Sequence, residues 1–450
     1  MEEDKSPSFL DTGEKAVKIA LKLGVDEAEA FLNSSTVVLV RVERGKIVQS
    51  SKHVDEGLGV RIVCNASLGF SYTNILNEES LEKNINKALH VAKSNKPDKN
   101  WPGFPTPNKL QTTKDTYDTR ITRLSLEEAV EMTSRMLESA LNFDKRVVPV
   151  EGSVTKGEVL KVVVNSCGVK FKDEGTYIHC SLGTIAKDGV NVTPTCFEYD
   201  DARTLNINPE RVGLEAAKYA VSALNAKKIE TGGYDVILAQ QALAGLFYYT
   251  LVNALKGDHV QRGMSMLKGK VGEKIASELF TAYDDGLLEG GISTWKFDDE
   301  GTPSQKTVLI EKGVLKGFIY DRYTARKEGF ESTGNARRTL ITPYASTPKI
   351  ETTNFTVLQR DKTPEQLLNE MDKGIFIHYV QGAHSSNPET GEFSVVATPA
   401  WIVEGGTPSH ALKGIMLTGT IYETLQKISG IANNVRKTYF LAAPWIKVDK

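Results

Sequence analysis

The sequence predicts an α+β protein in which two related helix–β-meander–helix units precede a β-rich, barrel-like or sandwich-like C-terminal domain. Three observations predict this class. The order helix, strands, helix occurs twice before residue 228, a proline-rich stretch separates the two occurrences, and the strands that follow do not alternate strictly with helices. A chain of 450 residues is also too long for one ordinary hydrophobic core. We therefore expect a first unit over 1–95, a linker over 96–108, a second unit over 109–228 and a C-terminal domain over 229–450.

The first unit is predicted to begin and end with helices. Apolar residues at helical spacing predict a helix over 13–23 that stops at Gly24. Asn77 is suited to cap a second helix over 78–93, because its side chain can accept a hydrogen bond from a free backbone N–H of the first turn. Short apolar runs bounded by turn residues predict the strands between these helices, at 28–32, 36–43, 47–51, 59–64 and 68–72.

The second unit follows a stretch, 95–108, that holds four prolines and suits neither helix nor strand. Ser125 and Glu128 have the spacing of a capping box and predict a helix that reaches about Leu141. Pro209 predicts the start of a closing helix that extends to residue 224. The meander between these helices is predicted as strands at 147–154, 158–165, 169–174 and 177–186.

The C-terminal domain is predicted to open with a strand over 234–239 that leads directly into a helix over 240–256. These two elements share a run of 20 residues, 236–255, without a formal charge, which is about the length of a membrane span. Polar residues within the run and the change from strand to helix predict a buried unit instead. Farther along, helices are predicted at 364–371 and 421–431, a hairpin at 306–311 and 314–320, and strands at 375–380, 393–402, 414–417 and 439–448.

The composition is that of a soluble globular protein without a strong electrostatic preference. The formal net charge is −2, and 25% of the residues are charged. A net charge so close to zero argues against direct binding to nucleic acid or to an anionic membrane surface. The N-terminus lacks the apolar segment of a secretory signal, and four cysteines are too few for a disulfide framework, so we expect a cytoplasmic protein with reduced thiols. Pairing of Cys180 with Cys196 across a hairpin stays open.

No catalytic motif is evident from residue spacing alone. No two of the seven histidines lie three or four residues apart, so none forms a helical zinc pair, although a site assembled from distant residues stays open. Neither a nucleophile elbow nor a phosphate-binding glycine loop occurs. The acidic run at 298–300 precedes a strong hairpin and is interpreted as a constrained structural loop near a pocket. Arg337 and Arg338 are interpreted as an exposed loop or as a clamp for a substrate carboxylate.

Several longer stretches resemble one protein family from about residue 14 to the C-terminus. The most specific is D-D-E-G-T-P-S-Q at 298–305, which is followed by G-V-L-K-G-F-I-Y-D-R-Y-T-A-R at 313–326. Both are similar to sequences of the TldD/PmbA family, whose members were once called modulators of DNA gyrase. Supporting stretches are D-E-G-L-G-V-R at 55–61, N-S-C-G-V at 165–169, G-Y-D-V-I-L-A at 233–239, A-L-K-G-D at 254–258, S-T-G-N-A-R-R at 332–338, N-P-E-T-G-E-F-S at 387–394 and A-P-W-I-K-V at 443–448.

The resemblance also implies where a zinc motif would be. TldD-type proteins are metallopeptidases with H-E-x-x-x-H on the helix before a G-L-E-G-D-like segment, and with a later cysteine ligand. The matching positions here hold Tyr248, Tyr249 and Asn253, and the cysteine position falls near Gln381, whereas no cysteine occurs after Cys196. Phenol and amide groups are poor zinc ligands, and neither can replace the glutamate as a general base. We therefore expect no metal ion and no other cofactor in this chain.

This departure is typical of the TldE/PmbA branch, whose members pair with a TldD subunit. The resemblance implies a cytoplasmic hydrolase component for proteolysis of unfolded peptides or small proteins, with zinc in the TldD-type partner, as a heterodimer or, alternatively, a homodimer. The alternatives are a metallopeptidase in its own right and a non-enzymatic regulator of DNA topoisomerase. The expected substrate or cavity residues are Asp298, Asp299, Glu300, Arg322, Asn335 and Arg338.

Overall fold

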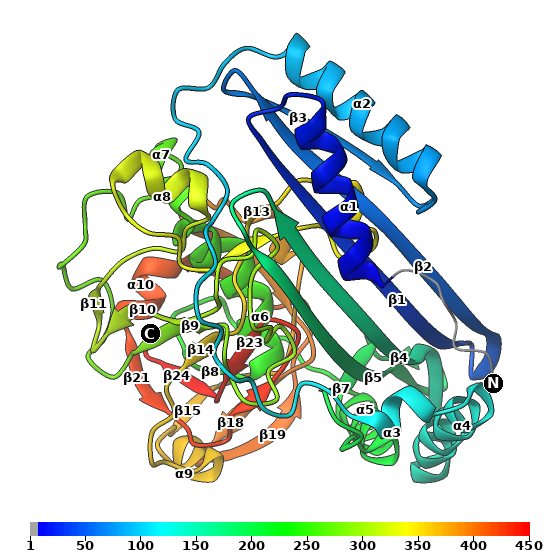
Figure 1. Ribbon diagram of the computed structural model, residues 1–450. Coiled ribbons are helices and arrows are strands. Elements are labelled where there is room, and N and C mark those ends of the chain that lie inside the picture. The colour runs from blue at the N-terminus through cyan, green and yellow to red at the C-terminus, as the bar shows by residue number, and fades with distance from the viewer. Residues whose placement is uncertain (1–7) are drawn as a thin grey trace.

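A long curved sheet wraps around one side of a β-rich C-terminal domain in the computed structural model, which describes residues 8–450 (Figure 1). The sheet has seven strands in the order β3-β2-β1-β4-β5-β6, with β7 also beside β5. Because β1 pairs antiparallel with β4, the two predicted N-terminal units share one sheet. The predicted α+β class is confirmed. The strands are β1 (Glu27–Glu43), β2 (Lys46–Cys64), β3 (Ser67–Thr73), β4 (Val147–Asn165), β5 (Lys170–Asp188), β6 (Asn191–Val192) and β7 (Cys196–Ala202).

Four of these strands are continuous where the sequence predicted two short strands each. β1, β2, β4 and β5 each run through residues that were interpreted as interruptions. Those predictions were wrong because the polar residues and glycines there do not form turns but pack against neighbouring strands of the sheet. Gly157 of β4, for example, lies directly under the ring of Tyr177, where an added Cβ would stand 2.2 Å from Cε1.

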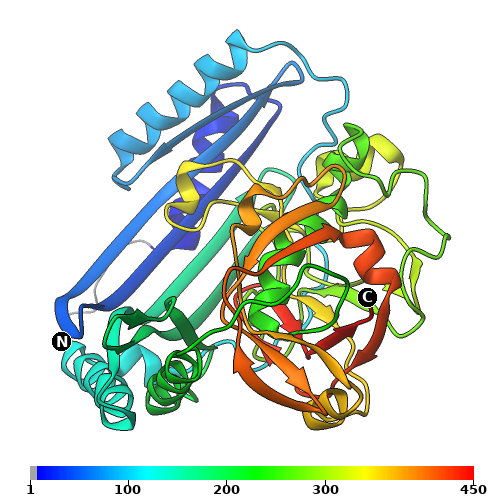
Figure 2. The same ribbon diagram turned by 180° about the vertical axis from the view of Figure 1, so that it is seen from behind.

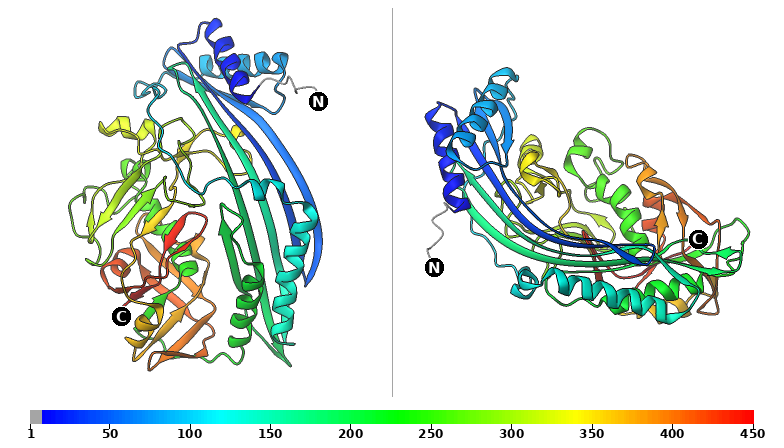
Figure 3. Two further views of the ribbon diagram at one scale, coloured as in Figure 1. Left: turned by 60° about the horizontal axis from the view of Figure 1, so that its bottom comes forward. Right: turned by 90° about the vertical axis from the view of Figure 1, so that its right-hand side faces the viewer.

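The helices of the N-terminal half cover the convex face of the sheet in two pairs (Figures 2 and 3). One pair is α1 (Phe9–Lys22) with α2 (Glu78–Ser94), and the other is α4 (Leu126–Phe143) with α5 (Pro209–Ser222). Successive residues of a strand point to opposite faces. The buried even-numbered residues of β1 accordingly pack against the helices, and they are Ala28, Ala30 and Leu32 at the first pair and Val38, Val40 and Val42 at the second.

The helix starts follow local capping chemistry. Asn77 Oδ1 accepts a hydrogen bond from the Ser80 N–H at 2.9 Å, and the capping box of Ser125 and Glu128 precedes α4 as predicted. The first helix begins at Phe9, earlier than predicted, because Ser8 and Asp11 form a further capping box. The short helix α3 (Thr119–Arg123) was not predicted.

The C-terminal domain contains two six-stranded sheets, β11-β10-β9-β14-β23-β22 and β19-β18-β15-β8-β24-β21, besides the sheet β16-β17-β20 and the pair β12-β13. The strands are β8 (Asp235–Leu238), β9 (Ala282–Asp285), β10 (Lys306–Glu311), β11 (Val314–Leu315), β12 (Ala336–Arg337), β13 (Lys349–Ile350), β14 (Phe355–Val357), β15 (Lys373–Ile377), β16 (Val380–Gln381), β17 (Glu392–Ala397), β18 (Ala400–Glu404), β19 (Thr407–Ala411), β20 (Met416–Thr420), β21 (Ile428–Ile431), β22 (Arg436–Lys437), β23 (Leu441–Ala443) and β24 (Ile446–Val448). The helices are α6 (Gln240–Phe247), the π turn η1 (Tyr248–Val252), α7 (Gly257–Gln261), α8 (Arg322–Glu328), η2 (Pro343–Ala345), α9 (Pro364–Asn369), η3 (Ala383–Ser385) and α10 (Ile421–Gln426).

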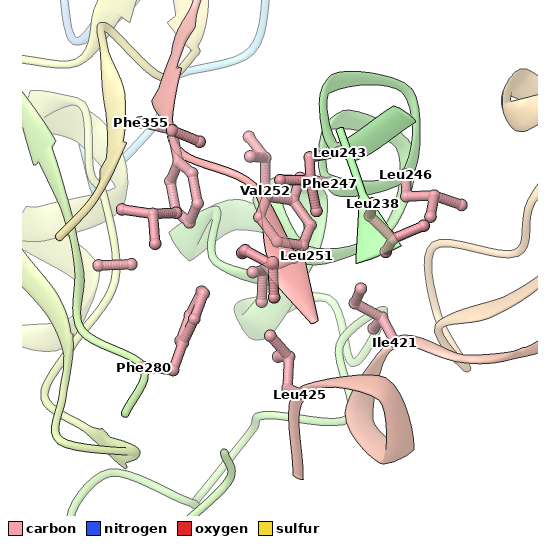
Figure 4. Packing of buried hydrophobic residues seen from close by; sticks show 14 of the residues in the cluster. Leu238, Leu243, Leu246, Phe247, Leu251, Val252, Phe280, Phe355, Ile421 and Leu425 are labelled. Atoms are coloured by element: carbon pink, nitrogen blue, oxygen red, sulfur yellow. The ribbon is translucent and has the colours of Figure 1, made fainter. Parts of the chain in front are cut away.

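The predicted strand–helix unit forms the centre of this domain. β8 leads into α6, and the apolar side of α6 is buried among both large sheets (Figure 4). The ring of Phe247 meets Phe280 and Phe355 edge-on at centroid distances of 6.1 and 5.9 Å. Removing such a buried ring costs about 3–5 kcal/mol. Over residues 8–450, no helix has the length and apolar character needed to cross a membrane.

Several predicted elements near the C-terminus were wrong in extent, among them the strand at 375–380, which is divided between β15 and β16 in different sheets. The predicted strand at 393–402 is divided into β17 and β18, because Pro399 lacks the N–H needed in a ladder. The predicted helix at 421–431 ends at Gln426, and the chain continues as β21. The terminal strand at 439–448 is likewise two strands, β23 and β24, which belong to different sheets.

The two cysteines that could have paired are separate and reduced. Cys180 lies opposite Asp200 in the β5–β7 ladder, whereas Cys196 lies opposite Thr184, four residues farther along β5. Four strand residues span about 13 Å, which is too far for a disulfide. Burial raises the pKa of the Cys196 thiol to about 12, so it is an inert packing residue.

Candidate functional site

A cavity of about 840 Å³ separates the concave face of the N-terminal sheet from the C-terminal domain. Residues of β1, β4, β5 and β7 form one wall, and loops of the C-terminal domain form the other. The β1 residues on this wall are Phe31, Asn33, Ser35 and Val37, which alternate with the helix-facing residues of the same strand. The lining is mostly apolar with a few polar groups, which is the usual composition of a ligand site.

Trp295 brings cationic side chains together on one side of this cavity. Lys161 Nζ lies 4.8 Å from the Trp295 ring, and Arg203 Cζ lies 5.0 Å from it. The Arg203 guanidinium also donates to the carbonyl oxygens of Thr176 at 2.6 Å and Thr294 at 2.8 Å. Burial lowers the pKa of Arg203 to about 10, so this side chain stays charged at neutral pH. The Trp295 ring therefore gives this wall an aromatic surface, whereas the Lys161 and Arg203 charges beside it are bound to groups of the protein itself.

A histidine–carboxylate pair lies on the sheet wall of the same cavity. His179 Nδ1 is 2.7 Å from Asp201 Oδ1, across the β5–β7 ladder. His179, Asp201 and Trp295 were not predicted as cavity residues. Alternation along β5 and β7 was the only signal available for the first two, because it places Tyr177 with His179 and Tyr199 with Asp201 on one face.

The positions that match the missing zinc motif lie beside this cavity, on a π turn and at the residue that follows it. Ala244 of α6 lines the cavity, and the helix continues with i→i+5 hydrogen bonding over Tyr248–Val252. Five residues of α-helix turn through about 500°, which would place Tyr248 and Asn253 about 140° apart. A π turn brings residues five apart close to one side of the helix. The backbone thus has the form that two ligands at this spacing would need.

The side chains at these positions do not fit zinc. The Tyr248 ring packs against Phe440 and Tyr249 at centroid distances of 5.0 and 5.1 Å. Burial, assisted by the Glu351 carboxylate, raises the pKa of Tyr248 to about 12, so the phenol stays neutral. Lys256 Nζ donates to Glu351 Oε1 at 2.7 Å and lies 5.8 Å from the centre of the Tyr248 ring. A cation therefore lies beside the position where a metal ion would need anionic ligands. Within the described residues, no group of three or more His, Cys, Asp or Glu side chains is arranged to hold a metal ion.

The loop that contains the missing cysteine position lies against the same helix. Gly245 of α6 allows this approach, because an added Cβ would stand 3.0 Å from Val380 Cγ2 and 3.5 Å from Ala383 Cβ. The His384 ring of this loop lies 6.4 Å from the Tyr249 ring. The structure therefore brings the region of Gln381 and the π turn together.

The predicted acidic loop is constrained by its own carboxylate. Asp298 is fully buried and accepts hydrogen bonds from the N–H groups of Glu300, Thr302 and Ala336, at 3.0, 2.9 and 3.1 Å. Asn335 is also buried, and its Nδ2 donates to Asp284 Oδ2 at 2.7 Å. These two predicted site residues hold loops of the C-terminal domain in place and do not line the cavity.

Ion pairs join three of the other four predicted residues to the N-terminal half of the chain, and hydrogen bonds to backbone carbonyls join the fourth, Arg322. Asp299 accepts from Lys161 Nζ at 3.0 Å, and Glu300 accepts from Arg61 at 2.9 Å. Burial opposes ionisation of Asp299, but the Lys161 and Arg337 charges lower its pKa overall. Arg338 Nη2 donates to Glu29 Oε1 at 2.9 Å, and Arg322 Nε donates to the linker carbonyl of Gly103 at 2.7 Å. Of the six predicted residues, Asp299 and Arg338 border the cavity.

The interpretation of the arginine pair as an exposed loop was wrong for Arg338, which is 5% exposed. Its guanidinium is held by Glu29 and by the carbonyl oxygen of Ser346, so it is not free to clamp a substrate carboxylate. Arg337 lines the cavity, where Nη1 donates to the Ser293 carbonyl at 3.1 Å. Arg337 is therefore the member of the pair that can face a ligand.

Comparison with known proteins identifies relatives along nearly the whole chain. Family models match residues 28–92 as PmbA/TldA metallopeptidase domain 1, 120–224 as the central domain and 231–450 as the C-terminal domain. An uncharacterized protein of Methanocaldococcus jannaschii is 32% identical, with 96% of this chain and 97% of that protein covered. The metalloprotease PmbA of Escherichia coli O157:H7 is 26% identical, with 94% and 91% covered.

Solved structures show the same arrangement of domains. TldE from Thermococcus kodakarensis has a TM-score of 0.91 and 31% identity, and the match covers 97% of this chain and 98% of that one. A structure described as a putative modulator of a DNA gyrase, from Thermotoga maritima, has a TM-score of 0.89 and 28% identity, with 98% and 99% covered.

Proposed function

The chain belongs to the PmbA/TldD metallopeptidase family, and on this premise we propose that it is a TldE/PmbA-like subunit of a cytoplasmic TldD–TldE-type metallopeptidase. The family assignment made from the sequence motifs is confirmed. In the proposed complex the TldD-type partner holds the zinc ion and performs hydrolysis. This chain assembles with that partner and holds the substrate.

One observation carries this proposal, namely the side chains on the π turn beside the cavity. A peptidase zinc takes about three protein ligands and polarises a bound water molecule, while a carboxylate accepts the proton. Tyr248 and Asn253 stand at the two histidine positions and Tyr249 stands at the glutamate position. The neutral phenol of Tyr248 and the nearby Lys256 ammonium suit neither task. Hydrolysis by this chain alone therefore has no chemical basis at this site.

The cavity supports a role in holding substrate. The Trp295 ring can bind the aromatic or aliphatic side chains of a peptide, and Arg337, which lines the cavity, can orient its carbonyl or terminal carboxylate groups. The volume of about 840 Å³ accommodates a short peptide segment and excludes a folded domain. The proposed substrates are accordingly unfolded peptides or small proteins, and the C-terminal loops exclude bulk water from the bound segment.

Co-purification with a TldD-type subunit tests the proposal. We expect a stable complex that cleaves an unfolded peptide, a TldD-type subunit that is weak or inactive alone, and this chain inactive alone. Cleavage by this chain alone, abolished by a chelator, would instead establish it as a metallopeptidase in its own right. Salt-dependent binding to DNA or to a topoisomerase, without any complex formation, would favour the regulatory alternative.

A further inference from the structure

Asp201 and His179 form a polar pair on the sheet wall of the cavity, apart from the positions of the zinc motif. They lie directly opposite each other in the β5–β7 ladder, and both line the cavity. His179 Nδ1 is 2.7 Å from Asp201 Oδ1, and the two side chains are 32% and 13% exposed. Because paired strands fix the positions of their side chains, the pair is held in place and is still accessible from the cavity.

The carboxylate determines which nitrogen of the imidazole carries a proton. An ionised carboxylate can only accept hydrogen bonds, so His179 Nδ1 must donate the hydrogen that joins it to Asp201. In the neutral ring, Nε2 then has a lone pair and is a hydrogen-bond acceptor. Within residues 8–450, Nε2 of His179 has no hydrogen-bond partner. The pair thus combines an unused acceptor with a negative charge.

The neighbouring carboxylate shows that the position of Asp201 is distinctive. Successive residues of a strand point to opposite faces, so Asp200 of β7 points to the face that the helices cover. There it lies 3.2 Å from Arg211 Nη2 of α5 and lines a separate surface groove. Asp201 has no such arginine, and His179 is its one ion-pair partner among the described residues.

The cations of the cavity do not neutralise this pair. Lys161 and Arg203 lie at the Trp295 ring, where the Lys161 ammonium donates to Asp299 and the Arg203 guanidinium donates to backbone carbonyl oxygens. Arg337 donates to the carbonyl oxygen of Ser293. The negative charge of Asp201 is therefore available to a cation that enters with a ligand.

The side chains around the pair on the same face are neutral. Tyr177 precedes His179 on this face of β5, Tyr199 precedes Asp201 on β7, and Thr155 lies opposite His179 on β4. The Tyr199 ring lies 6.4 Å from the imidazole. Burial raises the pKa of both phenols, so neither competes with the carboxylate for a cation by its own charge. In such a partly desolvated place, a hydrogen bond between charged groups is stronger than in water.

We propose that the Asp201–His179 pair binds an ammonium group, either the amino terminus of a peptide or a lysine side chain that enters the cavity. His179 Nε2 accepts one N–H of the ammonium, and the Asp201 carboxylate behind the imidazole balances its charge. An acetylated amine has lost this charge and two of its N–H groups. The binding of this group rests on the proposed role of the cavity in holding peptides, but it requires neither hydrolysis nor a partner subunit.

Three short peptides test the proposal on the full-length chain by isothermal titration calorimetry. The first is a tetrapeptide amide of three alanines and one phenylalanine with a free amino terminus, and the second is its N-acetyl form. The third is an N-acetyl form in which a lysine replaces one alanine. The free amine should bind about tenfold more tightly than the N-acetyl form, because one charge-assisted hydrogen bond distinguishes them.

Variants of the pair show where this preference arises. Asp201→Asn should bind the free and the acetylated peptide equally, and His179→Phe, which keeps a ring beside Tyr199, should lose most of the preference. Asp200→Asn is the matched control, because it removes a carboxylate from the other face of the same strand, and it should keep the tenfold preference. The preference is a ratio of two dissociation constants for one protein, so a general loss of affinity in a variant does not change it.

The lysine peptide distinguishes the two sources of the ammonium. Affinity equal to that of the free amine would support recognition of any ammonium, whereas affinity equal to that of the acetylated alanine peptide would support recognition of the amino terminus. Equal binding of the free and acetylated peptides to the unmodified chain would overturn the proposal and leave the cavity as a peptide site. An unchanged preference in Asp201→Asn would also overturn it, by placing the ammonium elsewhere. Binding of none of the peptides would overturn it together with the proposed role of the cavity.

Discussion

Arg61 and Glu29 form a buried two-point ion pair at the contact between the sheet and the C-terminal domain. Arg61 Nε donates to Glu29 Oε1 at 2.8 Å and Nη2 donates to Oε2 at 2.5 Å, and the two side chains are 4% and 0% exposed. Arg61 Nη1 also reaches Glu300 at 2.9 Å, and Arg338 binds the same Glu29 carboxylate. Two strands and two distant loops are therefore joined through one carboxylate and one guanidinium.

We predict that Arg61→Met lowers the free energy of unfolding by about 3–5 kcal/mol, because it leaves buried carboxylates without one of their counter-charges. Urea unfolding followed by fluorescence and by circular dichroism measures this loss. Lys218→Met, in an exposed pair with Glu215, is the control and should change stability little. Equal effects of the two variants would show that the buried network contributes no more than a surface pair.

The sequence indicated the local features of this fold but not the contacts between distant segments. The caps at Asn77 and Ser125 were predictable because capping chemistry lies within four residues. The length of β1 was not predictable, because Asn33–Ser35 has the composition of a turn. Only the folded structure shows that these polar residues lie in a strand beside the cavity. Side-chain alternation showed that each strand has two faces, but it could not show which face meets the C-terminal domain.

The candidate site was predictable only where a family motif fixed the residue positions to compare. The positions of Tyr248, Tyr249 and Asn253 followed from the family resemblance. The burial of Asp298 and Arg338 could not follow from sequence, because their partners lie on loops and strands brought together by folding. A charged residue next to a turn has the same local signature whether it meets solvent or a buried counter-charge.

Trp295 should determine how well the cavity binds a peptide. We predict that Trp295→Leu weakens binding of an unfolded peptide to the proposed complex about tenfold, because a central aromatic contact is worth more than 1 kcal/mol. Fluorescence anisotropy of a labelled peptide measures the dissociation constant. Trp101→Phe, in the linker and away from the cavity lining, is the matched control. Unchanged binding in Trp295→Leu, with the fold intact, would place the peptide elsewhere.

His378 should make the contact between the domains sensitive to acid. Burial lowers the pKa of His378 below its usual 6.5, although Glu198, whose Oε2 lies 3.8 Å away, opposes the shift. Arg436 also faces this group, and the Tyr219 ring stacks on it at 4.0 Å. A lowered pKa in the folded state means that the unfolded state binds the proton more readily. The contribution of His378 to stability is therefore complete above pH 6.5 and is lost as the pH falls through and below that value.

We predict that the free energy of unfolding decreases between about pH 7 and about pH 5, and that His378→Gln reduces this decrease. Urea unfolding at both pH values, for the two proteins in parallel, measures the difference. Other groups that titrate in this range affect both proteins equally, so the comparison isolates His378. An identical pH dependence of the two proteins would mean that His378 is not protonated selectively in the unfolded state.

Metal content provides the sharpest test of the subunit role. We predict that the purified chain, dialysed without chelator, holds well below one equivalent of zinc and cleaves no unfolded peptide. The π turn gives positions 248 and 253 a common side of the helix, so the deficiency lies in the side chains and not in the backbone.

We further predict that Tyr248→His with Asn253→His restores no peptidase activity. The carboxylate at Tyr249 and the thiolate near Gln381 are still missing, and the Lys256 ammonium remains beside the site. Inductively coupled plasma mass spectrometry, with a TldD-type relative that retains H-E-x-x-x-H measured in parallel, gives the zinc stoichiometry. Stoichiometric zinc in the unmodified chain, together with chelator-sensitive cleavage in the absence of any partner, would return this protein to the independent metallopeptidases.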